Sequence, residues 1–265
     1  MNKNPVGIFD SGIGGLTVLK KIREVLPNEN LIYFCDSKNV PYGEKSASEV
    51  RGLVKEGVEF LISKGAKVVV IACNTATAVA IEELRRLFDI PIIGMEPAIK
   101  PAIKNNEGGK ILVLATPLTL REAKFNALKH NFDLDEDCII LPAEGLASKI
   151  EEHLLKNYSK NSYSSEIERM LDKALVDIDA KKISFVVLGC THYSFIRPYI
   201  ENFFTKRAKI ISGNDGTVYY LKKVLEHHGL LNQKEDMGSV DFFSSDPDLE
   251  NIEEKFMGIM GNYLE

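Results

Sequence analysis

The sequence contains no tryptophan, and phenylalanine and tyrosine bring its aromatic content to only 8% of 265 residues. Proteins that bind single-stranded nucleic acid usually stack bases on aromatic side chains along a basic groove. Here 33 lysine and arginine residues are outnumbered by 38 aspartate and glutamate residues, and the formal net charge is −5. The chain therefore lacks a basic field, and we expect no nucleic-acid partner.

Long apolar segments are also missing. The longest apolar runs have the length of a strand, whereas a membrane-spanning helix needs about 20 apolar residues. The first five residues lead directly into a predicted strand and contain no apolar core of a signal peptide. These features predict a cytoplasmic protein that does not contact a membrane.

Cysteine is scarce as well. The chain has four, Cys35, Cys73, Cys138 and Cys190, and no two of them form a Cys-x-x-Cys pair. In a reducing compartment they are not expected to form disulfides, and their spacing does not match a structural zinc site. We therefore predict neither a disulfide nor a metal site.

A regular alternation of two kinds of segment is present instead. Short apolar runs rich in β-branched residues, such as residues 6–10, 31–35 and 110–115, alternate with segments whose apolar residues recur at helical spacing, such as 16–25 and 48–64. This alternation predicts an α/β fold with mainly parallel, doubly wound sheets.

The alternation occurs twice, so that the two halves of the chain look like a diverged internal repeat. We expect two pseudo-symmetric domains, with the C-terminal segment returning to the first. Residues 1–97 and 211–265 are assigned to the first domain, and residues 98–210 to the second. Because open α/β sheets bind ligands beyond the carboxyl ends of their strands, the active site is predicted in the cleft between the domains.

Two strand-like runs end alike. Residues 68–75 read Val-Val-Val-Ile-Ala-Cys-Asn-Thr, and residues 185–192 read Phe-Val-Val-Leu-Gly-Cys-Thr-His. Continuous apolar runs are typical of strands buried on both faces, so Cys73 and Cys190 are predicted at the carboxyl ends of central strands. Each also precedes a predicted helix start, which would lower the pKa of the thiol.

The first of these helices has two candidate caps, Asn74 and Thr75. Free cysteines are more often small apolar core residues than reactive groups, and this is what we predict for Cys35 and Cys138.

Two thiols that face each other across a cleft suit one reaction well. A thiolate on one side can remove a proton from a carbon acid, and a thiol on the other side can return one, which inverts a stereocentre without a cofactor. Each thiol needs a proton partner. Asp10 ends the first predicted strand at the edge that carries Cys73, and His192 lies two residues after Cys190. Glu144 and Glu151 are both candidates for a further carboxylate.

The glycine-rich turn at residues 11–15 has the setting of a dinucleotide-binding loop, between a strand and a helix. The third glycine of that motif is missing, and the charge of Asp10 would oppose a phosphate. We favour anion cradles for carboxylates, formed by Ser11, the turn amides and the amides near Asn74, Thr75 and Thr191. The segment 41–43, Pro-Tyr-Gly, is either a surface turn or a lid over the ligand.

Taken together, four motifs resemble the glutamate racemase family, in that family's order and across most of the chain. They are residues 9–16, 40–43, 72–76 and 188–193. The resemblance implies a cofactor-independent racemase with two pseudo-symmetric α/β domains, often a homodimer, that supplies D-glutamate for bacterial peptidoglycan. The implied partner is therefore a small molecule, glutamate, and no cofactor is expected.

By position, the resemblance makes Cys73 and Cys190 the acid–base thiols, with Asp10 assisting the first and His192 the second. It places a supporting glutamate at Glu151, with Glu144 as the competing candidate. The implied substrate-binding residues match the family's paired positions, namely Asp10, Ser11, Pro41, Tyr42, Gly43, Asn74, Thr75, Thr116, Thr119, Thr191 and His192.

The sequence departs from the family pattern at residues 210–214, where the usual acidic residue is missing, and it has no long N-terminal extension, so activation by a cell-wall precursor is not expected. Three alternatives remain at this stage. They are a racemase for aspartate, a non-catalytic amino-acid-binding module, and a nucleotide-binding oxidoreductase, which the broken glycine pattern disfavours.

Overall fold

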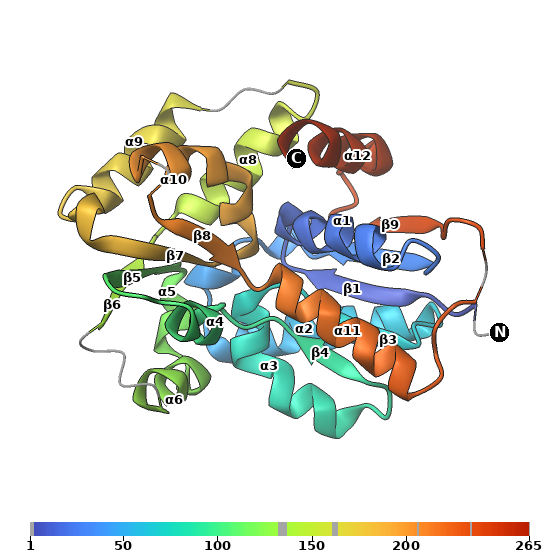
Figure 1. The fold of residues 1–265 in the computed structure, drawn as a ribbon. Coiled ribbons are helices and arrows are strands. Elements are labelled where there is room, and N and C mark those ends of the chain that lie inside the picture. The colour runs from blue at the N-terminus through green and yellow to red at the C-terminus, as the bar shows by residue number, and fades with distance from the viewer. Residues whose placement is uncertain (1–2, 132–136, 161–163, 206, 234, 265) are drawn as a thin grey trace.

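The computed structural model describes residues 3–131, 137–160, 164–205, 207–233 and 235–264, and it contains two parallel sheets flanked by helices (Figure 1). The first sheet has the strand order β4-β3-β1-β2-β9, and the second has the order β6-β5-β7-β8. The predicted α/β fold with mainly parallel sheets is confirmed. Both sheets are built by β–α alternation, which brings successive strands into parallel pairing.

The first sheet consists of β1 (Val6–Asp10), β2 (Leu31–Cys35), β3 (Val68–Ile71), β4 (Ile92–Gly94) and β9 (Val240–Ser244). Every residue of β1 and β3 is buried, as expected for central parallel strands covered by helices on both faces. The register pairs Phe9 with both Phe34 and Ile71, so β1, β2 and β3 reach the same edge. The polar residues that follow these strands therefore meet at one place.

The second sheet consists of β5 (Lys110–Ala115), β6 (Cys138–Pro142), β7 (Ile183–Gly189) and β8 (Lys209–Ser212). Strand β9 belongs to the first sheet, where its Phe242 pairs with Tyr33 of β2, so the C-terminal segment does return there. Strand β8 continues to Ser212 in the second sheet, so a domain boundary at 210/211 would cut through it. The division into domains stays a prediction.

The helices cover both faces of the sheets (Figure 1). They are α1 (Leu16–Val25), α2 (Ala47–Ser63), α3 (Asn74–Leu87), α4 (Ile99–Lys104), α5 (Pro117–Arg121), α6 (Ala123–Asn131), α8 (Leu146–Lys156), α9 (Ser165–Leu175), α10 (Arg197–Phe203), α11 (Asn214–His227) and α12 (Ile252–Tyr263). Helices α5 and α6 are separate, because Glu122 between them has an extended backbone.

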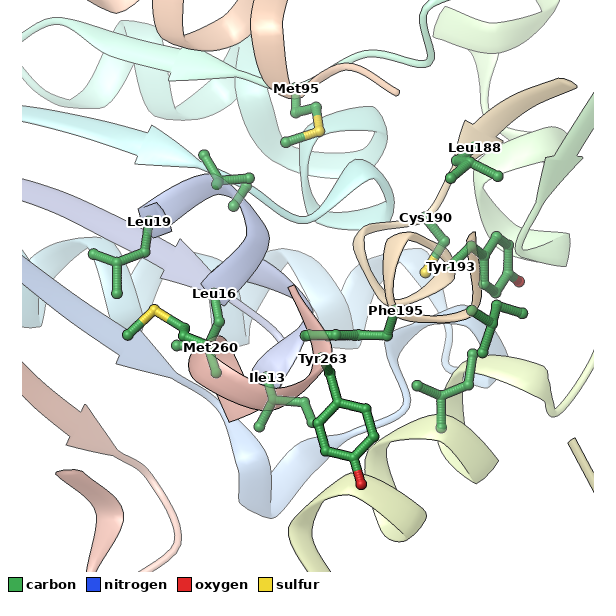
Figure 2. Packing of buried hydrophobic residues seen from close by; sticks show 14 of the residues in the cluster. Ile13, Leu16, Leu19, Met95, Leu188, Cys190, Tyr193, Phe195, Met260 and Tyr263 are labelled. Carbon is green, nitrogen blue, oxygen red and sulfur yellow. The ribbon is translucent and has the colours of Figure 1, made fainter. Parts of the chain in front are cut away.

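The two sheets share a continuous hydrophobic core. Phe195 and Tyr193, which follow β7, belong to the same buried cluster as Ile13 and Leu16 at the start of α1 and Tyr263 of α12 (Figure 2). Burial of this apolar surface fixes the glycine-rich turn of the first half against the segment after β7 in the second half.

The other two cysteines differ from each other. Cys35 is fully buried in the core, as expected, whereas Cys138 is only partly buried beside the smaller cluster of the second sheet. The prediction of a core role for Cys138 therefore needs correction. Cys138 is the first residue of β6, which lies at the edge of the sheet and is incompletely covered by neighbouring elements.

Within the ranges described above, no helix is both long and apolar enough to cross a membrane. The same residues contain no group of three or more histidine, cysteine, aspartate or glutamate side chains arranged to hold a metal ion.

Candidate active site

A cavity lies where the carboxyl ends of β1, β3 and β7 meet, and it contains about 460 Å³ of empty space, part of it open to solvent. Both Cys73 and Cys190 line it. Its walls also include Ser11, Val40, Pro41, Tyr42, Gly43, Glu44, Asn74, Thr75, Thr116, Pro117, Ala143, Gly145, Ala147, Ser148, Thr191 and His192. Residues that are far apart in the sequence are thus brought together as the pairing of parallel strands predicts.

Cys73 lies two residues after β3 and itself caps α3. The backbone N–H of Ala76 donates to its Sγ at 3.4 Å, and the Ser11 hydroxyl donates to the same atom at 3.5 Å. The thiol therefore occupies the capping position that the sequence suggested for Asn74 or Thr75, because the helix begins one or two residues earlier than those caps imply.

Burial raises the pKa of Cys73 to about 12, and the nearby Asp10 carboxylate adds to the effect. The hydrogen bonds from Ala76 and Ser11 act in the opposite direction but are weaker. The expectation that the helix start lowers this pKa is therefore wrong, because the loss of hydration on burial raises the pKa more than the helix end lowers it.

Asp10, the last residue of β1, is fully buried. Its carboxylate accepts the backbone N–H of Gly12 at 3.0 Å and the Thr191 hydroxyl at 3.2 Å. Burial raises the pKa of Asp10 to about 6, while the charge of His192 and the Gly12 hydrogen bond hold it down. A carboxyl group with this pKa can both take up and release a proton near neutral pH.

Cys190 follows β7 and is linked through His192 to a carboxylate. Its Sγ lies 3.7 Å from Nδ1 of His192, and Nε2 of the same ring lies 2.6 Å from Oε2 of Glu151. Burial lowers the pKa of His192, but its hydrogen bonds and charge interactions with Cys190 and Glu151 raise it well above the usual value. The imidazole is therefore protonated near neutral pH and places a positive charge beside the Cys190 Sγ.

The segment after Cys190 differs from the one after Cys73. It is a short 3-10 helix, Thr191–Ile196, without a side-chain cap, rather than the first turn of an α-helix. The two cysteines are thus alike in their place at a strand end, but their thiols are supported in different ways.

Of the two candidate glutamates, the structure brings Glu151 into the site. It is 3% exposed on α8, and its Oε2 also accepts the backbone N–H of Ile13 at 2.9 Å. Among the described residues its other oxygen, Oε1, has no hydrogen-bond partner. Glu144 is exposed before α8 and does not line the cavity.

The glycine-rich turn donates hydrogen bonds to two carboxylates of the protein itself. The amides of Gly12 and Ile13 donate to Asp10 and Glu151, so these two are not free to form the anion cradle that the sequence suggested. The glycines are required for close approach. A Cβ at Gly14 would lie 2.2 Å from the Thr191 hydroxyl oxygen and one at Gly12 2.6 Å from a Glu151 oxygen.

Three buried threonines bridge the two halves of the molecule. The hydroxyl of Thr75 on α3 lies 2.9 Å from that of Thr116 and 3.0 Å from that of Thr119, and these two are 2.9 Å apart. Thr116 caps α5. Thr75 and Thr116 line the cavity, whereas the predicted substrate-binding residue Thr119 does not and only hydrogen-bonds to them. The hydroxyls of Thr75 and Thr116 can hold a carboxylate without a basic side chain.

The segment 40–44 forms one wall of the cavity and is held in place by the buried side chain of Tyr42. Tyr42 is 2% exposed, its ring packs near Phe9, and its hydroxyl donates to Asp36 at 2.5 Å. Asn39 donates to the other oxygen of Asp36 at 2.9 Å. The Pro-Tyr-Gly segment is therefore a wall of the site and not a free surface turn.

Sequence reasoning missed three features of this site. They are the contribution of Asp36 beneath Tyr42, that of Tyr33 beneath the glycine turn, and the wall formed by residues 143–148. Asp36 had a signal, because it ends the second strand at the same edge as Asp10. Tyr33 lies inside a strand and had none.

Comparisons with known proteins agree with this geometry. The family model described as Asp/Glu/hydantoin racemase matches residues 7–220. A protein named glutamate racemase from Clostridium novyi is 46% identical over 264 residues, which cover 98% of this chain and 99% of that one. A second, from Clostridium perfringens, is 45% identical and covers 91% of this chain and 90% of its own length.

Solved structures show the same likeness. A glutamate racemase isoform from Bacillus anthracis superimposes with a TM-score of 0.83 at 30% identity, covering 100% of this chain and 95% of that one. One from Francisella tularensis, solved in complex with D-glutamate, gives a TM-score of 0.79 at 27% identity, with coverages of 98% and 95%.

Proposed function

This chain belongs to the Asp/Glu/hydantoin racemase family and is an amino-acid racemase, and from this premise we propose that it interconverts L- and D-glutamate with Cys73 and Cys190 as the two acid–base groups. The observation that supports the assignment of residues is that two buried thiols, at the ends of β3 and β7, line one cavity. A substrate whose α-carbon lies between them loses a proton on one face and gains one on the other.

The reaction balances without a redox step. The thiolate of one cysteine removes the α-proton, and the electron pair of the C–H bond stays on the substrate, delocalised into its α-carboxylate. The thiol of the other cysteine then gives its proton to the opposite face. The first cysteine ends as a thiol and the second as a thiolate, and the reverse reaction restores both.

The two thiols have different neighbours in this proposal. With a pKa of about 12, Cys73 holds its proton near neutral pH. The Sγ of Cys190 instead lies 3.7 Å from Nδ1 of His192. When Cys73 acts as the base, the substrate ammonium group offsets the burial of its thiolate, and Asp10 accepts the displaced proton.

Substrate recognition is proposed to rest on hydroxyl and amide donors. Among the described residues that line the cavity there is no lysine or arginine. Thr75 and Thr116, supported by Thr119, are available for one carboxylate of glutamate, and Ser11, Asn74 and Thr191 line the cavity together with the thiols. Such donors hold a carboxylate by hydrogen bonds without neutralising its charge.

The cellular role is proposed from family membership. We propose that the product D-glutamate enters peptidoglycan synthesis, that the chain works in the cytoplasm, and that it forms a homodimer. Light scattering of the purified protein tests the dimer, and growth of a depleted strain with and without added D-glutamate tests the cellular role.

The decisive experiment follows the circular dichroism signal of L- and D-glutamate, with no cofactor added. Wild-type protein is compared with Cys73→Ser and Cys190→Ser, and aspartate is offered as a second substrate. We expect racemisation of glutamate from both sides and a loss of at least a hundredfold in each variant. Unchanged racemisation in either variant would show that its thiol is not an acid–base group, and activity with aspartate alone would change the substrate.

A further inference from the structure

We propose that Tyr33 is a positioning residue for the Cys190 side of the site, acting through the single peptide unit that joins Gly12 and Ile13. The inference deepens the proposed function and rests on it. Tyr33 lies on the first sheet and touches neither thiol, so its effect must pass through the glycine-rich turn.

The hydroxyl of Tyr33 is held rigidly. The residue is the middle one of β2 and is fully buried. Its ring meets Phe242 of β9 and Phe256 of α12 edge-on, with ring centres 6.3 Å and 5.7 Å away. From this position the hydroxyl donates to the carbonyl oxygen of Gly12 at 2.6 Å. A buried ring packed on two sides cannot move without disturbing the core.

The carbonyl of Gly12 and the N–H of Ile13 belong to the same planar peptide unit and point in opposite directions. Tyr33 binds the carbonyl end, and the N–H end donates to Oε2 of Glu151 at 2.9 Å. Fixing one end of the plane therefore fixes the direction of the other. Hydrogen bonding at the carbonyl also polarises the N–H and strengthens the bond that it donates.

The Glu151 carboxylate depends on that bond for its orientation. Oε2 receives the Ile13 N–H and faces Nε2 of His192 at 2.6 Å, whereas Oε1 has no partner among the described residues. If the Ile13 N–H turned away, only His192 would hold the carboxylate. The ring of His192 in turn lies against the Cys190 thiol.

The Cys73 side is connected differently. Asp10 accepts the N–H of Gly12, which belongs to the preceding peptide unit, and Cys73 accepts its hydrogen bonds from Ser11 and Ala76. The Tyr33 hydroxyl donates to the Gly12 carbonyl and not to any of these groups. Loss of its hydroxyl should therefore weaken proton transfer at Cys190 more than at Cys73.

Deuterium exchange separates the two sides. In the Cys73→Ser protein, Cys190 alone can exchange the α-hydrogen of one enantiomer with D₂O, and in the Cys190→Ser protein Cys73 alone can exchange that of the other. Tyr33→Phe is introduced into both. We expect exchange by Cys190 to fall about tenfold, as the loss of one buried hydrogen bond predicts, and exchange by Cys73 to change by less than about twofold.

Tyr263→Phe is the matched control, since the Tyr263 hydroxyl also hydrogen-bonds to backbone carbonyls, those of Asn157, at 2.9 Å, and Lys160, outside the cavity. It should leave both exchange rates within about twofold. Equal losses in both backgrounds, including those caused by misfolding of Tyr33→Phe, would give Tyr33 a purely structural role and overturn the inference. The inference would also be overturned if Tyr33→Phe slowed exchange by Cys190 no more than Tyr263→Phe does.

The proposed function can fail separately. If wild-type protein left glutamate unchanged, or if neither single-cysteine protein exchanged any α-hydrogen, the two-thiol scheme itself would be wrong and the inference would fall with it. If each single-cysteine protein exchanged one enantiomer and Tyr33→Phe affected both alike, the scheme would stand and only the role of Tyr33 would be lost.

Discussion

At the scale of single residues, the raised pKa of Asp10 links the stability of the protein to pH. Its pKa rises from 3.8 to about 6, mainly because of burial. Between these two values the folded protein binds a proton that the unfolded chain has released, so the free energy of unfolding falls as the pH rises through this window. Above about pH 6 the folded protein carries a buried charge at a cost of about 3 kcal/mol.

Asp10→Asn should therefore make the protein more stable while it loses activity. Urea denaturation from pH 4 to pH 8 should show variant and wild type alike near pH 4 and the variant more stable by up to about 3 kcal/mol at pH 7. The exposed Asp89→Asn is the control, with changes below about 0.5 kcal/mol throughout. A constant difference over the whole pH range would show that titration of Asp10 is not the cause.

Glu151 and Glu144 form a natural pair of variants. Glu151→Gln removes the charge that helps to hold the pKa of His192 high. We expect kcat to fall on the order of a hundredfold, and the alkaline limb of its pH profile to move to lower pH, because His192 loses its proton more readily. Glu144→Gln, on the exposed loop, should leave both unchanged. Steady-state kinetics of both variants from pH 6 to pH 10 tests this prediction. If the two variants lost kcat equally, Glu144 would have to be counted among the residues that support Cys190.

The sequence was most informative for residues that follow strands. Cys73, Cys190 and Asp10 were found because a parallel sheet brings the ends of its strands to one edge. Whether burial or the helix end has the larger effect on the pKa of Cys73 was not predictable, since the effect of burial depends on how completely the folded protein excludes water from the thiol. Tyr33 was not predictable either, because a buried tyrosine in a strand is ordinarily a core residue.

At the scale of elements, the segment from Asp36 to Glu44 forms a wall of the cavity without regular strand or α-helical structure. Asp36 holds this segment in place, because it accepts hydrogen bonds from the side chains of Tyr42 and Asn39. Gly43 lies so close to the second half that a Cβ there would be 2.9 Å from Cβ of Thr116. The segment thus holds substrate-facing backbone against the threonine cluster.

Tyr42→Phe should loosen this wall while keeping the ring packed. A hydrogen bond to a charged group is lost, so we expect KM for glutamate to rise about tenfold. The thiols keep their hydrogen bonds, so kcat should change by less than about threefold. Tyr199→Phe, which removes a tyrosine–Glu168 bond away from the cavity, is the matched control. A fall in kcat at constant KM would place Tyr42 in the chemistry rather than in binding.

Strands were located better than helix ends. Residues 31–35 and 110–115 were predicted with the bounds that the structure has, since buried parallel strands are short and apolar throughout. The break at Glu122 is not predictable from the sequence, because both α5 and α6 have helical composition and no glycine or proline separates them. The start of α3 was placed late, because a thiol is not an expected cap.

At the scale of the whole molecule, the repeated β–α alternation predicted two parallel sheets and a site between them, and the cavity lies there. The repeat did not predict how unlike its two halves are. Cys73 begins an α-helix, while Cys190 leads into a 3-10 helix and uses His192 and Glu151. Such differences come from contacts between the halves, which no local pattern reports.

The opposite edge of the first sheet has a different task, and a buried ion pair lies there. Glu29 precedes β2 and Lys67 precedes β3, their charged atoms are 2.6 Å apart, and both side chains are 2% exposed. The second Glu29 oxygen accepts the backbone N–H of Asn232 at 2.7 Å. The pair thus ties the chain between α11 and β9 to the amino ends of the central strands.

Lys67→Met should destabilise the whole molecule without altering the chemistry. It leaves Glu29 buried and unpaired, which costs about 3–5 kcal/mol, whereas the double variant with Glu29→Gln should recover most of this loss. Lys156→Met, which breaks an exposed pair with Glu152, should cost less than about 1 kcal/mol. Because the pair lies at the strand ends away from the thiols, kcat per folded molecule should stay unchanged at a temperature where the variant is still folded. A large fall in kcat there would mean that the two edges of the sheet are coupled.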